Sequence, residues 1–224
     1  MRFFRRIAAS WSLGLRFLKV TGQVIYGAWK ITQLPQPIVS IFGGHLLKKD
    51  TIYINEAHQL ASMLVENNIS VLTGGGPGIM EAASSGAAHE HDKQIRSMAI
   101  GVKGIKGEKV LNTYVRTAVV LDYFFARKYL LIKYSYAFVL FPGGFGTLDE
   151  LSELLNLIEA GTRVPAPIIL IGSEYWHVYL TWIDRMLKEH LITPDGARQS
   201  LIVTDSIDEA LKILIKHCAT CTER

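Results

Sequence analysis

The sequence has 224 residues, of which 49% are hydrophobic and 20% are charged, as is typical of a globular protein with one well-buried core. This length fits a single domain, and no internal repeat or low-complexity segment is present. Six basic residues precede Pro35 and the first acidic residue is Asp50, so the chain from Pro35 onward has 18 basic and 20 acidic residues. The body of the chain therefore has no basic excess of the kind that nucleic-acid-binding domains carry.

Residues 1–33 predict an amphipathic helix within a basic N-terminal arm of residues 1–36. Apolar residues recur at helical spacing at Phe4, Ile7, Trp11, Leu15, Leu18, Ile25 and Trp29, with interruptions expected at Gly14 and Gly22. Arg16 and Lys19 break the run well short of the about 20 apolar residues that cross a bilayer, and a cleaved secretory signal fits poorly. Two interpretations stay open: the helix packs on the domain or on a partner subunit, or it makes a peripheral contact with an anionic membrane surface.

The domain proper is expected over residues 37–217, where short apolar runs alternate with helical patterns. Strands are predicted at 38–42, 69–72, 97–102, 119–121, 137–141, 167–172 and 200–204. Helices are predicted around 57–65, 79–89, 123–134, 151–158, 176–187 and 207–217. This alternation predicts a doubly wound α/β domain with a mostly parallel, Rossmann-like sheet.

Two of the predicted strands run into glycine-rich turns that open helices. The first turn is Thr73-Gly74-Gly75-Gly76-Pro77-Gly78, and the second is Pro142-Gly143-Gly144-Phe145-Gly146-Thr147. In parallel sheets ligands bind beyond the carboxyl ends of the strands, where glycine lets a phosphate approach the backbone and a helix N-terminus supplies N–H donors. Two such turns in one domain predict one bound nucleotide, although either turn alone is weak evidence.

The cysteines and histidines give little support for a metal site or a disulfide framework. Cys218 and Cys221 fall in an expected C-terminal tail of residues 218–224, and His217 beside them completes no ligand set. Two cysteines in an unligated tail fit a reducing compartment, so we expect a cytoplasmic protein without a metal or cofactor.

Three motifs in order resemble the Lonely Guy (LOG) family, also labelled lysine decarboxylase-like. Residues 73–81 are similar to its GGGxxGxM loop, Pro142 to Glu150 to its PGGxGTxxE motif, and Arg127-Lys128 to an Arg-Lys pair between them. The resemblance covers roughly residues 38–216. One departure is Gly44-His45 after the first strand, where the family usually has Gly-Ser.

The resemblance implies the roles of individual residues. It makes Glu150 and Arg127 catalytic, and it implies substrate binding by Gly74, Gly75, Gly76, Gly78, Lys128, Gly143, Gly144, Gly146 and Thr147. Each catalytic candidate has a structural alternative. Thr147 and Glu150 have the spacing of a capping box, and Arg127 could be an exposed helix charge. A carboxylate near a helix N-terminus is expected to stay ionised, because the helix dipole favours its charged form.

The implied activity is hydrolysis of the N-glycosidic bond of a nucleoside 5′-monophosphate, either AMP or a cytokinin riboside monophosphate such as isopentenyladenosine monophosphate. The products are the free base and ribose 5-phosphate. Family sites are completed at a dimer interface, which implies a homodimer or a larger homo-oligomer. The alternative to an enzyme is a sensor or carrier that binds a nucleotide without turnover. Decarboxylation is disfavoured, because no lysine lies in a recognisable pyridoxal phosphate setting.

Overall fold

The computed structural model describes the backbone of residues 2–88, 94–104 and 110–222, and their side chains except those of 2–10, 12, 221 and 222. A seven-stranded parallel sheet forms the centre of the molecule, in the order β4-β3-β2-β1-β5-β6-β7. The strands are β1 (Ile38–Phe42), β2 (Ser70–Thr73), β3 (Ser97–Val102), β4 (Ala118–Leu121), β5 (Ala137–Leu140), β6 (Ile168–Ile171) and β7 (Leu201–Thr204). The predicted doubly wound α/β fold is confirmed, and each predicted strand matches within one residue at either end.

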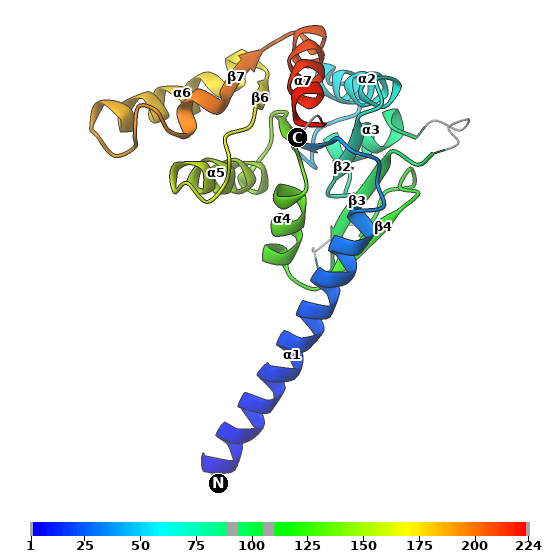
Figure 1. The fold of residues 1–224 in the computed structure, drawn as a ribbon, viewed down its shortest axis with the longest axis vertical. Coiled ribbons are helices and arrows are strands. Elements are labelled where there is room, and N and C mark those ends of the chain that lie inside the picture. The colour runs from blue at the N-terminus through cyan, green and yellow to red at the C-terminus, as the bar shows by residue number, and fades with distance from the viewer. Residues whose placement is uncertain (1, 89–93, 105–109, 223–224) are drawn as a thin grey trace.

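Helices cover both faces of this sheet (Figure 1). They are α1 (Arg2–Ile31), α2 (Ile52–Glu66), α3 (Ile79–Gly86), α4 (Phe124–Lys133), α5 (Phe145–Glu159), α6 (Ser173–Lys188) and α7 (Ile207–Thr222), with a short 3-10 helix η1 (Ala197–Ser200). One apolar cluster joins the sheet to α1, α4, α5 and α6, and the other joins it to α2, α3 and α7.

The central strands are apolar on both sides, because both of their faces are covered. In β5, Phe138 and Leu140 belong to one apolar cluster, while Ala137 and Val139 belong to the other. Successive side chains of a strand point to opposite faces, so a continuous apolar run supplies both cores at once. This explains why the strands appear in the sequence as unbroken runs rather than as alternating patterns.

The strand order reverses at β1, which pairs with β2 on one side and with β5 on the other. The connections after β1 and β5 therefore leave in opposite directions and open a crevice at the carboxyl ends of these strands. Both glycine-rich turns lie at this edge, one after β2 and one after β5.

The N-terminal arm is one continuous helix, and the predicted interruptions at Gly14 and Gly22 are not found. Val20 and Ile31 are buried in the core cluster that also contains residues of α4 and β4. The interpretation of a helix that packs on the domain is thus confirmed for the C-terminal half of α1. Within the described residues, no helix is both long enough and apolar enough to span a bilayer.

The C-terminus departs from the sequence prediction. Helix α7 continues to Thr222 instead of ending at His217, and Cys218 is buried in the apolar cluster under α2 and α7. The expected tail from residue 218 is therefore wrong as far as Thr222, because Cys218, an apolar residue one turn beyond Leu214, lengthens the buried face of the helix.

Candidate active site

Three loops meet at the carboxyl edge of the sheet, and backbone hydrogen bonds join them. The N–H of Gly44, after β1, donates to the carbonyl of Pro142 at 2.9 Å. The carbonyl of Gly44 in turn accepts from the N–H of Ile79 at 3.1 Å, at the start of α3. The loop after β1 is thus held between the two glycine-rich turns, which brings these turns together.

Glycine is required in these turns because the loops touch one another. A Cβ on Gly143 would overlap the side chain of Thr147 and the N–H of Gly44. Gly78 has φ of +69°, and a Cβ there would overlap the carbonyl of Gly44. Gly143 and Gly78 therefore act as packing residues that bring the loops together.

The first turn of α5 begins earlier than the capping-box interpretation requires. The N-cap is Gly144, which makes no side-chain capping bond, and Thr147 is a buried residue inside the first turn. The structural alternative of a capping box formed by Thr147 and Glu150 is thus wrong. The first N–H groups of a helix have no partner within it, so the amides of residues 145–147 are available to a ligand at the cavity.

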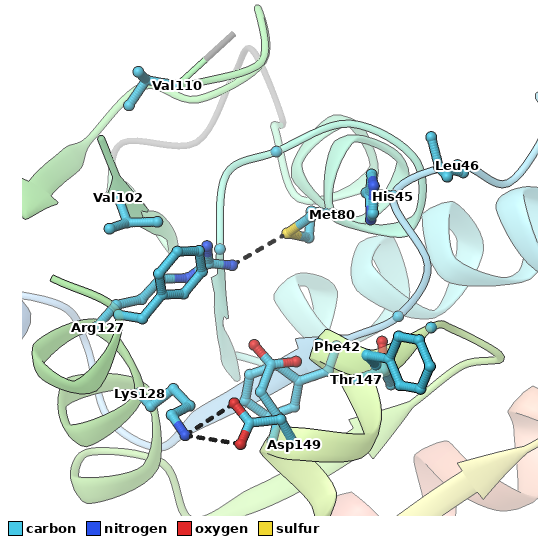
Figure 2. A pocket seen from close by; sticks show the side chains of 18 of the residues that line it. Phe42, His45, Leu46, Met80, Val102, Val110, Arg127, Lys128, Thr147 and Asp149 are labelled. Atoms are coloured by element: carbon cyan, nitrogen blue, oxygen red, sulfur yellow. Dashed lines mark hydrogen bonds and ion pairs between the residues drawn. The ribbon is translucent and has the colours of Figure 1, made fainter. Parts of the chain in front are cut away.

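A cavity of about 470 Å³ lies over the three loops, α4 and the first turns of α5 (Figure 2). This volume is within the range of about 300 to 1,000 Å³ common for small-molecule sites. Among the sequence-predicted residues, those that line it are Gly74, Gly76, Arg127, Lys128, Gly144, Gly146, Thr147 and Glu150. The others, Gly75, Gly78 and Gly143, are not among the lining residues and instead belong to the loops that build the cavity.

Arg127 enters the cavity from α4, and its side chain is buried despite its charge. Its guanidinium lies directly over Gly74, where a Cβ would overlap it, and its Nη2 is 3.6 Å from the sulfur of Met80. It also lies 5.9 Å from the centre of the Phe124 ring. Figure 2 shows the side chain pointing from α4 toward Met80 on α3. The alternative of an exposed helix charge is therefore wrong.

Glu150 faces the same cavity from α5, and its carboxyl is surrounded by protein on most sides. Burial raises its pKa from the ordinary value of 4.5 to about 7, while the positive charge of Arg127 opposes the rise. The neighbouring Asp149 raises it further. The structure thus differs from the expectation that this group stays ionised, because burial raises its pKa. A carboxyl with this pKa exchanges protons readily at neutral pH.

Lys128 differs from its neighbour because its charge is already paired. Its ammonium lies 2.9 Å from Asp149 and 2.6 Å from Glu153 on α5, as the dashed contacts to Asp149 in Figure 2 show. Burial alone would lower the pKa of Lys128, but the carboxylates of Glu153 and Asp149 outweigh it and raise the pKa. Lys128 therefore joins α4 to α5, and a ligand phosphate would have to compete with two carboxylates for it.

Sequence reasoning missed two residues that position the loops. The side-chain amide of Asn112 donates to the carbonyls of Gly75 and Gly76, at 3.0 and 3.1 Å. The hydroxyl of Tyr175 on α6 donates to the carbonyl of Gly143. No local pattern marks either residue, because each lies more than 30 residues from the loop that it contacts. A third omission, Phe145, is visible in the motif itself and is 92% exposed at the cavity.

Comparison with known proteins places this chain in a family. Residues 80–214 match the family described as "Possible lysine decarboxylase". Among curated proteins, the cytokinin riboside 5′-monophosphate phosphoribohydrolase LOG3 of Arabidopsis thaliana is 29% identical over 83% of this chain and 85% of its own. LOG5 of the same plant is 32% identical over 70% of this chain and 68% of its own.

Solved structures share the fold at lower identity. The molybdenum cofactor carrier protein of Chlamydomonas reinhardtii has a TM-score of 0.59 and 20% identity, over 82% of this chain and 99% of its own. The molybdenum cofactor binding protein of Rippkaea orientalis has a TM-score of 0.56 and 23% identity, over 81% and 96%. The motif resemblance, the family match and the curated relatives agree, and the chain belongs to the LOG, or lysine decarboxylase-like, family.

Proposed function

We propose that the protein hydrolyses the N-glycosidic bond of a nucleoside 5′-monophosphate and releases the free base and ribose 5-phosphate. One observation carries the proposal: Arg127 on α4 and Glu150 on α5 line one cavity together with both glycine-rich loops. The curated relatives are named as phosphoribohydrolases acting on cytokinin riboside 5′-monophosphates. The geometry and the relatives thus support the same reaction.

The phosphate is assigned to the first turn of α5. Gly144 and Gly146 have no heavy atom within 4 Å of a Cβ position, so a phosphate can reach the backbone there. The free N–H groups of this turn and the positive end of the helix dipole favour a dianion. Tyr175 supports this assignment. Its hydroxyl donates to the carbonyl of Gly143, and in a trans peptide the following N–H, that of Gly144, points in the opposite direction from that carbonyl.

The chemistry is assigned to Glu150, with Arg127 beside it. In hydrolysis the C1′–N bond breaks with its electron pair on the base, and the oxygen of water bonds to C1′. The attacking water loses one proton and the leaving nitrogen gains one. Ionised Glu150 takes the proton from water and stabilises the positive charge that develops on the ribosyl group. Arg127 favours this ionised form, because its charge lowers the pKa of Glu150. The scheme needs no metal or cofactor.

The base is assigned to the apolar side of the cavity, where Met80, Val102, Val110 and Phe124 lie. Apolar and aromatic side chains stack on a purine and accommodate an alkyl substituent without requiring polar partners. AMP and a cytokinin riboside monophosphate both fit this chemistry, so both belong in the substrate panel. The names of the relatives favour the second.

We extend the proposal to a cytoplasmic homodimer. Three aromatic side chains of α4, Phe124, Phe125 and Tyr129, are more than half exposed, and contiguous exposed apolar surface marks interaction sites. Phe124 also lines the cavity, so a partner subunit on this face would adjoin the site. Light scattering of the wild type and of a Phe125→Ser/Tyr129→Ser variant measures the mass. A monomeric wild type refutes the dimer.

The test is base release from a panel of nucleoside 5′-monophosphates, with nucleotide binding measured by calorimetry on the same proteins. We expect release by the wild type, and a loss of at least about 100-fold in Glu150→Gln with binding retained, because general base catalysis contributes about 10² to 10⁴. Lys216→Met, an exposed charge on α7, is the control and keeps full activity. Binding of nucleotides without release of any base would replace the hydrolase with a nucleotide sensor or carrier.

A further inference from the structure

Helix α1 carries two apolar faces on opposite sides, and only one of them packs on the domain. The packed face contains Val20, Val24, Gly27 and Ile31, which recur at spacings of three and four residues. A Cβ on Gly27 would meet the side chain of Leu130, so the helix approaches α4 closely. At about 100° per residue, this face is about 180° from the apolar stripe that the sequence predicted. The predicted stripe is therefore not the surface that docks on the domain.

The second face remains exposed along the helix. Its members are Trp11, Leu15, Leu18, Ile25 and Trp29, with exposed fractions of 71%, 62%, 71%, 64% and 55%. We call these five residues the outer stripe. A helix of 30 residues is about 45 Å long, and Figure 1 shows its N-terminal half extending beyond the domain. So large an exposed apolar surface on a folded protein marks an interaction site.

The charge of α1 decides what this surface fits. Residues 2–31 contain six Lys and Arg residues and no Asp or Glu. A second copy of the same helix would supply no acidic partner for these charges, which disfavours a paired helix. An anionic lipid surface attracts each nearby basic residue by about 1 kcal/mol. The tryptophans near both ends of the outer stripe, Trp11 and Trp29, are residues that prefer the lipid–water interface.

The orientation of the domain is compatible with such a surface. Because the packed face is opposite the outer stripe, the domain lies on the side of α1 away from anything that the stripe contacts. Two tethers hold the helix there: Lys19 pairs with Asp122 at 2.5 Å, and the N–H of Asp122 donates to Gln23 at 3.2 Å. The helix can therefore lie flat between the domain and a planar partner.

We propose that the outer stripe of α1 inserts into the interface of a membrane that contains anionic lipid and holds the domain at its surface. The inference is independent of the proposed hydrolysis, because none of the stripe residues lines the cavity. Deletion of the arm is a poor test, since it also removes Val20 and Ile31 from the core. Substitutions within the outer stripe keep the packed face intact.

The experiment is flotation of the full chain with vesicles of phosphatidylcholine, alone or mixed with phosphatidylserine. We expect binding to the mixed vesicles that weakens as salt is raised, because exposed charges are screened. Leu15→Ser/Leu18→Ser should weaken partitioning at least about tenfold, since each leucine loses apolar burial. Val178→Ser on α6, 75% exposed and outside the stripe, is the matched control and should bind as the wild type does.

Three results would overturn the proposal. One is equal binding by the wild type and the Leu15→Ser/Leu18→Ser variant, and another is equal binding to vesicles with and without the anionic lipid. The third is a wild-type assembly, seen by light scattering without vesicles, that the double substitution converts to smaller species. That last result would assign the outer stripe to contact between copies of this chain.

Discussion

Replacing Glu150 by Gln should stabilise the protein at alkaline pH while removing its proposed activity. The physical reason is that burial makes the ionised carboxyl unfavourable in the folded state and raises its pKa from 4.5 to about 7. A group whose pKa is raised on folding contributes stability below its unfolded pKa, and this contribution is lost as pH rises through the folded pKa. For Glu150 the loss therefore develops between pH 4.5 and 7.

The magnitude follows from the shift. Each pKa unit corresponds to about 1.4 kcal/mol, so ionised Glu150 costs up to about 3 kcal/mol at pH 8 and under about 1 kcal/mol at pH 5. Contact with solvent in the cavity makes these figures upper bounds. For a chain of this size about 1 kcal/mol shifts the melting temperature by about 2 to 4 °C. Glu150→Gln should thus raise the melting temperature at pH 8 by up to about 4 to 9 °C relative to its effect at pH 5.

The assay is thermal unfolding followed by circular dichroism at pH 5 and pH 8, with wild type and variant measured side by side. Glu189→Gln is the control, because this exposed glutamate at the end of α6 pairs with Arg185 at 2.8 Å and should give no gain at pH 8. An equal change in melting temperature at both pH values for Glu150→Gln would refute the reasoning. It would mean that the carboxyl titrates in its ordinary range and that burial does not shift it.

Three further predictions concern the site and the core. Gly74→Ala should displace the guanidinium of Arg127 and reduce base release at least about tenfold. Gly22→Ala, in open space on α1, is the control and should not change base release. Steady-state rates of base release check both variants. Arg127→Ala should move the acidic limb of the pH–rate profile to higher pH, since the charge of Arg127 lowers the pKa of Glu150. An unmoved limb would mean that Arg127 does not influence the pKa of Glu150. Trp176→Ala should cost about 3 to 5 kcal/mol of unfolding free energy, measured with urea, because this fully buried side chain fills the core under α6; a loss below about 1 kcal/mol would contradict that packing.

The sequence was sufficient to predict the elements and their order. Strand positions follow from apolar runs such as 137–141, and helix positions follow from apolar residues spaced three and four apart, as in α2. Both patterns are local, because the burial of one face or of both faces determines which neighbouring residues are apolar. The glycine turns were also predictable, since a phosphate-accessible backbone needs glycine where the chain bends from strand to helix.

Helix starts and pairing partners were harder to predict. Thr147 and Glu150 have the spacing of a capping box, but α5 begins at Phe145, so Thr147 lies inside the helix rather than at its N-cap. Likewise the apolar stripe that the sequence predicted for α1 includes the outer stripe, which is exposed. Only the position of α4 and β4 decides that the face with Val20 and Ile31 is buried.

The electrostatics of the site depended entirely on tertiary structure. Lys128 and Arg127 are adjacent in the sequence, yet one is paired with Asp149 and Glu153 while the other lies buried over Gly74. The pKa of Glu150 reflects desolvation and charges that come from another helix. The sequence by itself thus determined the fold, the family and the candidate residues. The charge states and contacts were decided by distances between segments far apart in the chain, and a one-dimensional pattern does not contain those distances.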